Sequence, residues 1–358
     1  MSAIPRWTWL VPSISIVLLA AAMARGVGLV LEIVCGAALV ASVFAAVHHA
    51  EVVAHRVGEP FGTLVLAISV SVIEASLILS MMLAGGADAA VLARDTIYAA
   101  VMIICNGVVG ICILVGGLAH REQSFRVEGA GAGFAALIAM TALSLVLPDF
   151  TISSGYATYT SSQLGFVAAA CLALWAVFVF IQTSRHRDYF LPVANPSDTE
   201  SHALPPSNRE AWASFGLLVV SLVAVVGLAK VLSPVIERTV AAASAPQAVI
   251  GIIIAMLVLL PETIAAVQAA RANRLQTSMN LAIGSALASI GLTVPVVAVA
   301  AIVLQMPLVL GLEPKDLVML AITFMVSTVT LGTGRTHLMQ GAVHLVLFAS
   351  YLFLALVP

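Results

Sequence analysis

Two glutamates stand inside long apolar stretches of the sequence, one in each half of the chain. Glu74 lies within GEPFGTLVLAISVSVIEASLILSMML, and Glu262 lies within PQAVIGIIIAMLVLLPETIAAVQAARANR. They are 188 residues apart, and each stretch has a glycine near its start, Gly62 and Gly251. An ionised carboxylate in the middle of a bilayer is costly unless it is paired or solvated. Two of them at matching positions therefore predict a functional site.

Three arrangements would make a pair of buried carboxylates tolerable: a bound cation, bound protons, or basic side chains beside them. No Lys or Arg stands near the middle of any apolar stretch. Cation binding and proton binding remain, and a site that alternates between them is the chemistry of proton-coupled cation exchange. The alternative without transport is that both glutamates are protonated, hydrogen-bonded structural groups.

The residues around the glutamates suit a hard cation, because calcium takes six to eight oxygen ligands from carboxylates, amides, hydroxyls and carbonyls. Ser71 precedes Glu74 by three residues and so shares its helical face. Pro261 would free backbone carbonyls one turn before Glu262. The full set of predicted metal ligands is Glu74, Glu262, Asn106, Asn280, Ser71 and Ser285.

The elements that must hold these residues are membrane-spanning helices. The chain has 358 residues, of which 61% are hydrophobic and only 9% charged, whereas about a quarter are charged in a soluble domain. Apolar runs of this length span a bilayer as helices. We predict an all-α membrane protein with eleven spans, at 7–25, 28–56, 60–84, 95–119, 127–148, 162–184, 212–234, 246–270, 276–305, 316–334 and 336–357.

The two halves are predicted to be repeats. The span after each glutamate contains an N-x-x-x-G pattern with a further glycine, and small residues at such spacing let helices approach closely. The residues are Asn106, Gly110 and Gly116 in the first half and Asn280, Gly284 and Gly291 in the second. The prediction is one N-terminal helix, 1–26, and two five-helix repeats, 27–184 and 212–358, joined by a linker, 185–211. Five helices per repeat would insert the second upside down, as in many secondary transporters.

Basic residues set the predicted orientation. With the N-terminus in the cytoplasm, ten Lys and Arg residues fall inside and five outside, which favours that orientation and places the linker in the cytoplasm and the C-terminus outside.

Other ionisable residues lie in two of the spans. His48, Glu51 and His55 share one helical face near the inner surface, where they would form a proton path or simply a polar helix end. His344 is alone in the last span, where a histidine is more often a hydrogen-bonding group between helices.

Other classes of function fit less well. The order H-A-E-V-V-A-H from His49 to His55 does not match the H-E-x-x-H of a zinc protease, and no P-loop for an ATP-driven pump is present. No cofactor, enzymatic activity or nucleic-acid partner is expected, only inorganic cations, protons and lipid. A passive cation channel, with the carboxylates as a selectivity ring, stays open as a rival.

The stretches GEPFGTLVLAISVSVIEASLIL and LLPETIAAVQAARANRLQTSMNLAIGSALASIGLTVP resemble the two α-repeats of the cation/Ca2+ exchanger superfamily, and most closely its ChaA-type calcium/proton antiporters. The resemblance implies a bacterial inner-membrane antiporter that exports Ca2+ in exchange for protons, with Glu74 and Glu262 as the shared sites. Na+ or K+ exchange is the alternative in such proteins. The chain departs from many relatives at Ser289, where they carry Asn or Asp, and its linker is mixed in charge rather than acidic.

Overall fold

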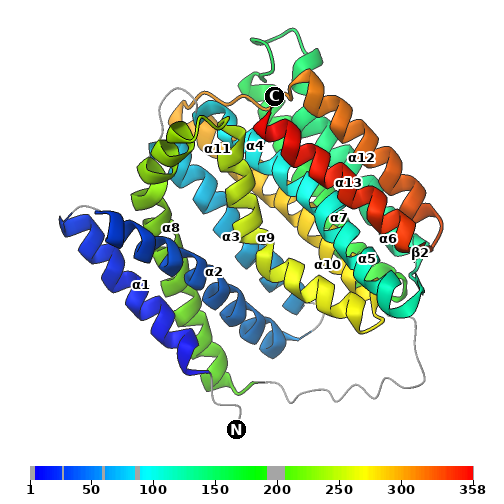
Figure 1. Ribbon diagram of the computed structural model, residues 1–358, viewed down its shortest axis with the longest axis horizontal. Coiled ribbons are helices and arrows are strands. Elements are labelled where there is room, and N and C mark those ends of the chain that lie inside the picture. The colour runs from blue at the N-terminus through cyan, green and yellow to red at the C-terminus, as the bar shows by residue number, and fades with distance from the viewer. Residues whose placement is uncertain (1–4, 26–27, 59–60, 85–88, 192–205, 358) are drawn as a thin grey trace. The chain divides into compact units, whose positions relative to one another are not determined.

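The structure is a computed structural model that describes residues 5–25, 28–58, 61–84, 89–191 and 206–357. Most of the predicted linker, 185–211, lies outside these ranges. The elements in chain order (Figure 1) are α1 Arg6–Arg25, α2 Leu29–Val57, α3 Phe61–Ala84, α4 Ala89–Met102, η1 Ile103–Val108, α5 Val109–His120, β1 Glu122–Ser124, α6 Val127–Thr141, η2 Ala142–Val146, η3 Leu147–Phe150, α7 Ser161–Phe180, η4 Ile181–Arg185, η5 Arg187–Tyr189, α8 Asn208–Ala242, α9 Ala248–Arg271, α10 Leu275–Ala288, η6 Ser289–Thr293, α11 Val294–Leu304, α12 Pro314–Gly332, β2 Arg335–His337 and α13 Leu338–Leu356.

The prediction of eleven spanning helices is confirmed. Within the described residues, eleven helices are long and apolar enough to cross a membrane. The observed spans differ most from the predicted limits at the start of the fourth span and at the end of the seventh. The fourth span begins at Ala89 rather than 95, because the charges of Arg94 and Asp95 neutralise each other in an ion pair. The seventh runs to Ala242, because α8 continues through Pro234 instead of ending there.

The chain forms two compact units, and each takes segments from both predicted repeats. The first unit is Met1–Ala89 with Thr199–Ile250, and the second is Ala90–Asp198 with Gly251–Pro358. The repeat relation between the halves stays a prediction. The two units are described separately below.

In the first unit, α2 packs against α1, α3 and α8. Among the described residues, one buried polar contact between α2 and α1 is the hydrogen bond from Ser42 Oγ to Ser15 Oγ at 2.8 Å. The long helix α8 begins with a capping box. Glu210 N donates to Ser207 Oγ, and Ser207 N donates to the Glu210 carboxylate at 2.8 Å, which fixes the point where the chain enters the first turn.

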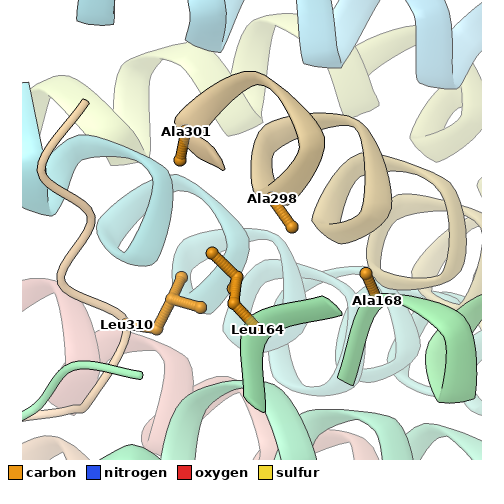
Figure 2. Close-up of a cluster of buried hydrophobic side chains, with 5 residues drawn as sticks. All are labelled: Leu164, Ala168, Ala298, Ala301 and Leu310. Atoms are coloured by element: carbon orange, nitrogen blue, oxygen red, sulfur yellow. The ribbon is translucent and has the colours of Figure 1, made fainter. Parts of the chain in front are cut away.

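In the second unit, the core lies between helices that approach closely through small residues. Figure 2 shows one such place, where α7 packs against α11 and the segment that follows it. The residues are Leu164 and Ala168 of α7, Ala298 and Ala301 of α11, and Leu310 after α11. A Cβ at Gly291 would lie 2.5 Å from the Cβ of Trp175, so glycine is required where η6 meets α7.

A short sheet, which the sequence did not predict, joins two connections of the second unit. Strands β1 and β2 pair antiparallel, with Glu122 opposite His337 and Ser124 opposite Arg335. The pairing gives hydrogen-bond partners to backbone N–H and C=O groups in both connections. The sheet therefore ties the α5–α6 connection to the α12–α13 connection.

In the part of the second unit that the structure describes, four spans contain π-helical segments, and two of these segments stand at corresponding places in the two halves of the chain. In the fourth span, η1 begins at Ile103, and in the ninth, η6 begins at Ser289. These starts are 186 residues apart, close to the offset of the two glutamates. Asn106 lies within η1, whereas Asn280 lies in α10, well before η6. The two amides are therefore at different positions along their spans.

Candidate ion-binding site

Glu74 lies inside the first unit, on a helix with no other charged residue. Helix α3 reads FGTLVLAISVSVIEASLILSMMLA. The Glu74 side chain is 3% exposed, and Ser71 on the same face is equally buried. Its flanking residues Ile73 and Ala75 are buried hydrophobics. The structure thus has a carboxylate and a hydroxyl on one face of an apolar helix, as the spacing predicts.

Glu262 lies in the second unit, on α9, directly after a proline inside the helix. Its side chain is half-buried, and Arg271 in the last turn is the only basic residue of α9. Pro261 has no N–H to donate to the carbonyl of Leu257, so that carbonyl lacks its usual helical partner. Carboxylate and released carbonyl stand about one turn apart on one helix.

Both glutamate-bearing helices begin with a glycine held close to another backbone. In the first unit, a Cβ at Gly62 would meet the carbonyl oxygen of Ala54 at 2.5 Å. In the second, a Cβ at Gly251 would lie 2.8 Å from Thr96 N. The two glycines near the starts of these stretches thus have the same physical role, each within its own unit. The pairing of Glu74 with Glu262 in one site stays a prediction.

The amide and hydroxyl candidates of the second unit make specific contacts in the chain. Asn106 is fully buried, and its Oδ1 lies 3.2 Å from Nδ1 of His344. Asn280 Nδ2 donates to the carbonyl of Phe190 at 2.6 Å, and its Oδ1 accepts from Gln276 Nε2. Ser285 is half-buried on α10. Both amides therefore have hydrogen-bond partners within the chain.

The predicted proton-path residues lie at the end of α2 in the first unit. His48 is half-buried, with its ring centroid 5.6 Å from that of Trp7, whereas Glu51 and His55 are exposed. His49 was not among the residues that the sequence singled out for this path. It is fully buried, and its Nε2 donates to the carbonyl of Thr8 at 2.9 Å. The adjacent histidine pair was visible in the sequence, but only the packing of α1 shows which of the two is buried. The proton path itself stays a prediction.

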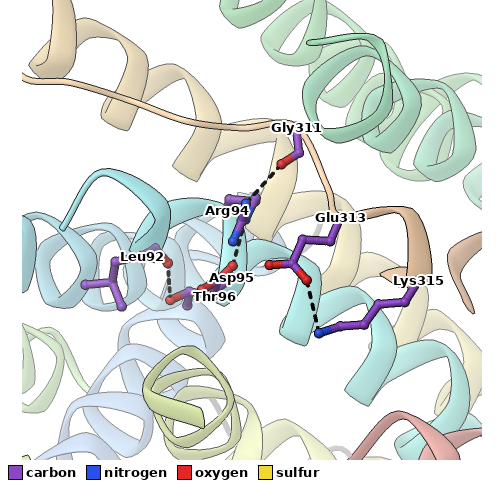
Figure 3. A network of polar contacts seen from close by, with 7 residues as sticks. All are labelled: Leu92, Arg94, Asp95, Thr96, Gly311, Glu313 and Lys315. Atoms are coloured by element: carbon purple, nitrogen blue, oxygen red, sulfur yellow. Dashed lines mark hydrogen bonds and ion pairs between the residues drawn. The ribbon is translucent and has the colours of Figure 1, made fainter. Parts of the chain in front are cut away.

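A cluster of charged residues in the second unit was also not predicted from the sequence (Figure 3). Arg94 Nε donates to Asp95 Oδ1 at 2.7 Å, and Arg94 Nη1 donates to the carbonyl of Gly311 at 3.2 Å. Lys315 Nζ lies 3.1 Å from Glu313 Oε2 in the same region. The side chains of Arg94 and Asp95 are little exposed. This cluster joins α4 to the segment before α12, and its residues are far apart in the sequence.

No ready-made metal centre is formed by ionisable residues alone. Within the ranges that the structure describes, no three or more His, Cys, Asp or Glu residues are placed to hold a metal ion. A cation at Glu74 or Glu262 would therefore need hydroxyl, carbonyl or water oxygens as well, which are common ligands of calcium.

Comparison with known proteins identifies relatives along nearly the whole chain. One relative is y4hA of Sinorhizobium fredii (strain NBRC 101917 / NGR234), which is named as an ionic transporter. The two sequences are 46% identical over 362 residues, which cover 99% of this chain and 97% of the relative. The chain is 35% identical to the sodium-potassium/proton antiporter ChaA of Escherichia coli (strain K12), with 88% and 85% of the two chains covered. It is 24% identical to a Ca(2+)/H(+) antiporter of Aphanothece halophytica, with 70% and 69% covered.

Solved structures share the fold. The structure of native YfkE superposes with a TM-score of 0.74 at 18% identity, covering 98% of this chain and all of that one. The H+/Ca2+ exchanger CAX gives a TM-score of 0.74 at 14% identity, with 97% and 87% covered. The spanning helices and the bacterial antiporter relatives indicate a protein of the inner membrane.

The family model described as "Sodium/calcium exchanger protein" matches residues 27–184 and 213–357, which together are most of the chain. These ranges include both glutamates and leave out the first helix and the linker. Together with the helices that carry Glu74 and Glu262, this match shows that the chain belongs to the sodium/calcium exchanger family of the cation/Ca2+ exchanger superfamily.

Proposed function

We propose that this protein exports Ca2+ from the cytoplasm in exchange for protons that enter from outside. The observation that carries the proposal is the buried Glu74 in the otherwise uncharged helix α3. Its sequence counterpart Glu262 follows the helix-interior Pro261 of α9. Two carboxylates together match the charge of a divalent cation, and two protons neutralise them equally well.

The exchange follows from the cost of leaving these carboxylates charged and empty. When Ca2+ binds, Glu74, Glu262 and Ser71 supply oxygen ligands, and the carbonyl released by Pro261 supplies another. Asn106, Asn280 and Ser285 complete the proposed ligand set. When protons bind, the carboxylates become neutral and their affinity for the cation falls. Access to the site changes from one side of the membrane to the other only when the site holds the cation or protons. An empty site with charged carboxylates is costly in a low-dielectric interior.

A second candidate function is exchange of Na+ or K+ for protons at the same site. It is favoured by the relative from Escherichia coli, which is 35% identical and named a sodium-potassium/proton antiporter. The relatives named as Ca2+/H+ antiporters are 24% identical. A monovalent cation would leave one carboxylate to be protonated, so ion preference and proton stoichiometry are linked.

The test is ion uptake by proteoliposomes that contain the purified protein and an acidic interior. We expect Ca2+ uptake that stops when a protonophore removes the pH gradient. Glu74→Gln and Glu262→Gln should each abolish it, whereas Glu128→Gln, at an exposed position in the first turn of α6, should leave it unchanged.

Three outcomes would contradict the proposal. Gradient-driven uptake of Na+ or K+ without Ca2+ uptake would establish the second candidate. Ca2+ flux that does not depend on the pH gradient would indicate a channel. Exchange that persists in both Gln variants would remove the glutamates from the site.

A further inference from the structure

A fully buried group of polar side chains lies in the second unit, between η1, α12 and α13. Asn106, Thr323 and His344 are 0% exposed, and Thr330 is 2% exposed. All four stand in predicted membrane spans, where a polar group without a partner costs free energy. From the sequence, His344 was expected only to hydrogen-bond between helices and Asn106 only to bind a cation, and no contact between the two was predicted.

The contacts of His344 define its tautomer. Nδ1 lies 3.2 Å from Asn106 Oδ1, and Nε2 lies 3.1 Å from Thr330 Oγ1. A carboxamide oxygen only accepts hydrogen bonds, so Nδ1 must be the donor. A neutral imidazole has one N–H, and its Nε2 therefore accepts from the Thr330 hydroxyl.

The other end of the Asn106 carboxamide is fixed as well. Its Nδ2 donates to Thr323 Oγ1 at 2.9 Å, and Thr323 Oγ1 in turn donates to Met102 Sδ at 3.6 Å. The amide is therefore held from both sides by side chains of α12 and α13. Removing His344 would leave Oδ1 without this donor and let the carboxamide rotate.

Glycines bring α13 close enough for this contact. A Cβ at Gly110 of α5 would lie 3.0 Å from the Cβ of His344, and a Cβ at Gly341 would lie 2.6 Å from Leu114 N. Because the backbones approach this closely, a side chain on α13 reaches η1 directly.

We propose that His344 is a positioning residue that holds the Asn106 carboxamide for cation binding. The inference rests on the proposed function, in which Asn106 is a cation ligand. It adds a residue from the last helix, 238 positions away in the chain.

Two substitutions at one position separate the two contacts of His344. In His344→Asn, the amide nitrogen takes the place of Nδ1 and keeps a donor for Asn106. In His344→Gln, the amide oxygen takes the place of Nε2 and keeps an acceptor for Thr330. We expect His344→Gln to raise the apparent KM for the cation about two- to tenfold, the effect of one lost hydrogen bond. His344→Asn and the control Ser350→Ala should keep the wild-type KM.

A double-variant measurement excludes a packing effect. If His344 acts through Asn106, adding His344→Gln to Asn106→Ala should not change KM further, because the contact is already lost. Effects that add would overturn the positioning role, as would a KM in His344→Gln equal to that of wild type. Equal effects of the Asn and Gln variants would also overturn it.

If wild-type protein exchanges cations and Glu74→Gln does not, failure of the His344 variants to respond contradicts this inference alone. If wild-type protein does not exchange cations at all, the proposed function itself fails.

Discussion

The Thr330 hydroxyl lies 3.1 Å from Nε2 of His344, and neither side chain is accessible to solvent beyond 2%. The contact joins α12 to α13 inside the second unit.

Thr330→Val should destabilise the protein. Valine has the same shape but no hydroxyl, so Nε2 of His344 loses its donor in a buried place, at a cost of about 1–3 kcal/mol. Thr328→Val is the matched control, because Thr328 is exposed on the same helix and its hydroxyl only bonds the carbonyl of Phe324. Thermal unfolding in detergent should show a lower midpoint for the first variant only. Equal midpoints would mean that the buried contact contributes nothing.

Gly341→Ala should disrupt the packing of α13 on α5. A Cβ at this position would lie 2.6 Å from Leu114 N, and backbone atoms cannot move aside as a side-chain end can. The cost of such overpacking is about 1–3 kcal/mol. Gly165→Ala in α7 is the control, since nothing lies within 4 Å of its Cβ position and alanine is the better helix former. The prediction fails if the two variants unfold at the same temperature.

Arg94→Gln should cost more stability than Arg335→Gln. Arg94 is little exposed and binds both Asp95 and the carbonyl of Gly311. Arg335 and Glu122 are 3.8 Å apart and mostly exposed, and such pairs contribute about 0–1 kcal/mol. Removing Arg94 also leaves the Asp95 carboxylate without its partner, which costs more than losing an exposed pair. Urea or thermal unfolding of both variants gives the comparison, and a larger loss for Arg335→Gln would contradict it.

Ca2+ should raise the melting temperature of the wild-type protein. A ligand that binds only the folded state stabilises it by about 2.7 kcal/mol at a hundred times its dissociation constant. The effect should weaken as the pH falls, because protons compete for the same carboxylates. Glu74→Gln should not respond to Ca2+, whereas Glu128→Gln should respond like wild type. A Ca2+ effect that is independent of pH would argue against a shared site.

The number and limits of the spans could be predicted from the sequence, because hydropathy over about 20 residues is a local property. The apolar setting of Glu74 was predictable for the same reason. The errors in span limits occurred at the ion pair of the adjacent Arg94 and Asp95 and at Pro234, because a charge or a proline was taken as the end of a span although the helix continues through it. The strands β1 and β2 were missed, since three residues paired with three others far away leave no local pattern.

The sequence by itself determined the membrane-spanning class of the protein and pointed to Glu74 and Glu262 as the candidate site, because a carboxylate inside an apolar span is costly unless it is paired, solvated or protonated. Only the tertiary structure decided which polar side chains hold one another. His49 rather than His48 is buried, and His344 contacts Asn106 across 238 residues. Such contacts depend on how closely two helices approach and how each is rotated, and this is set by glycines such as Gly110 and Gly341 acting on helices distant in the sequence.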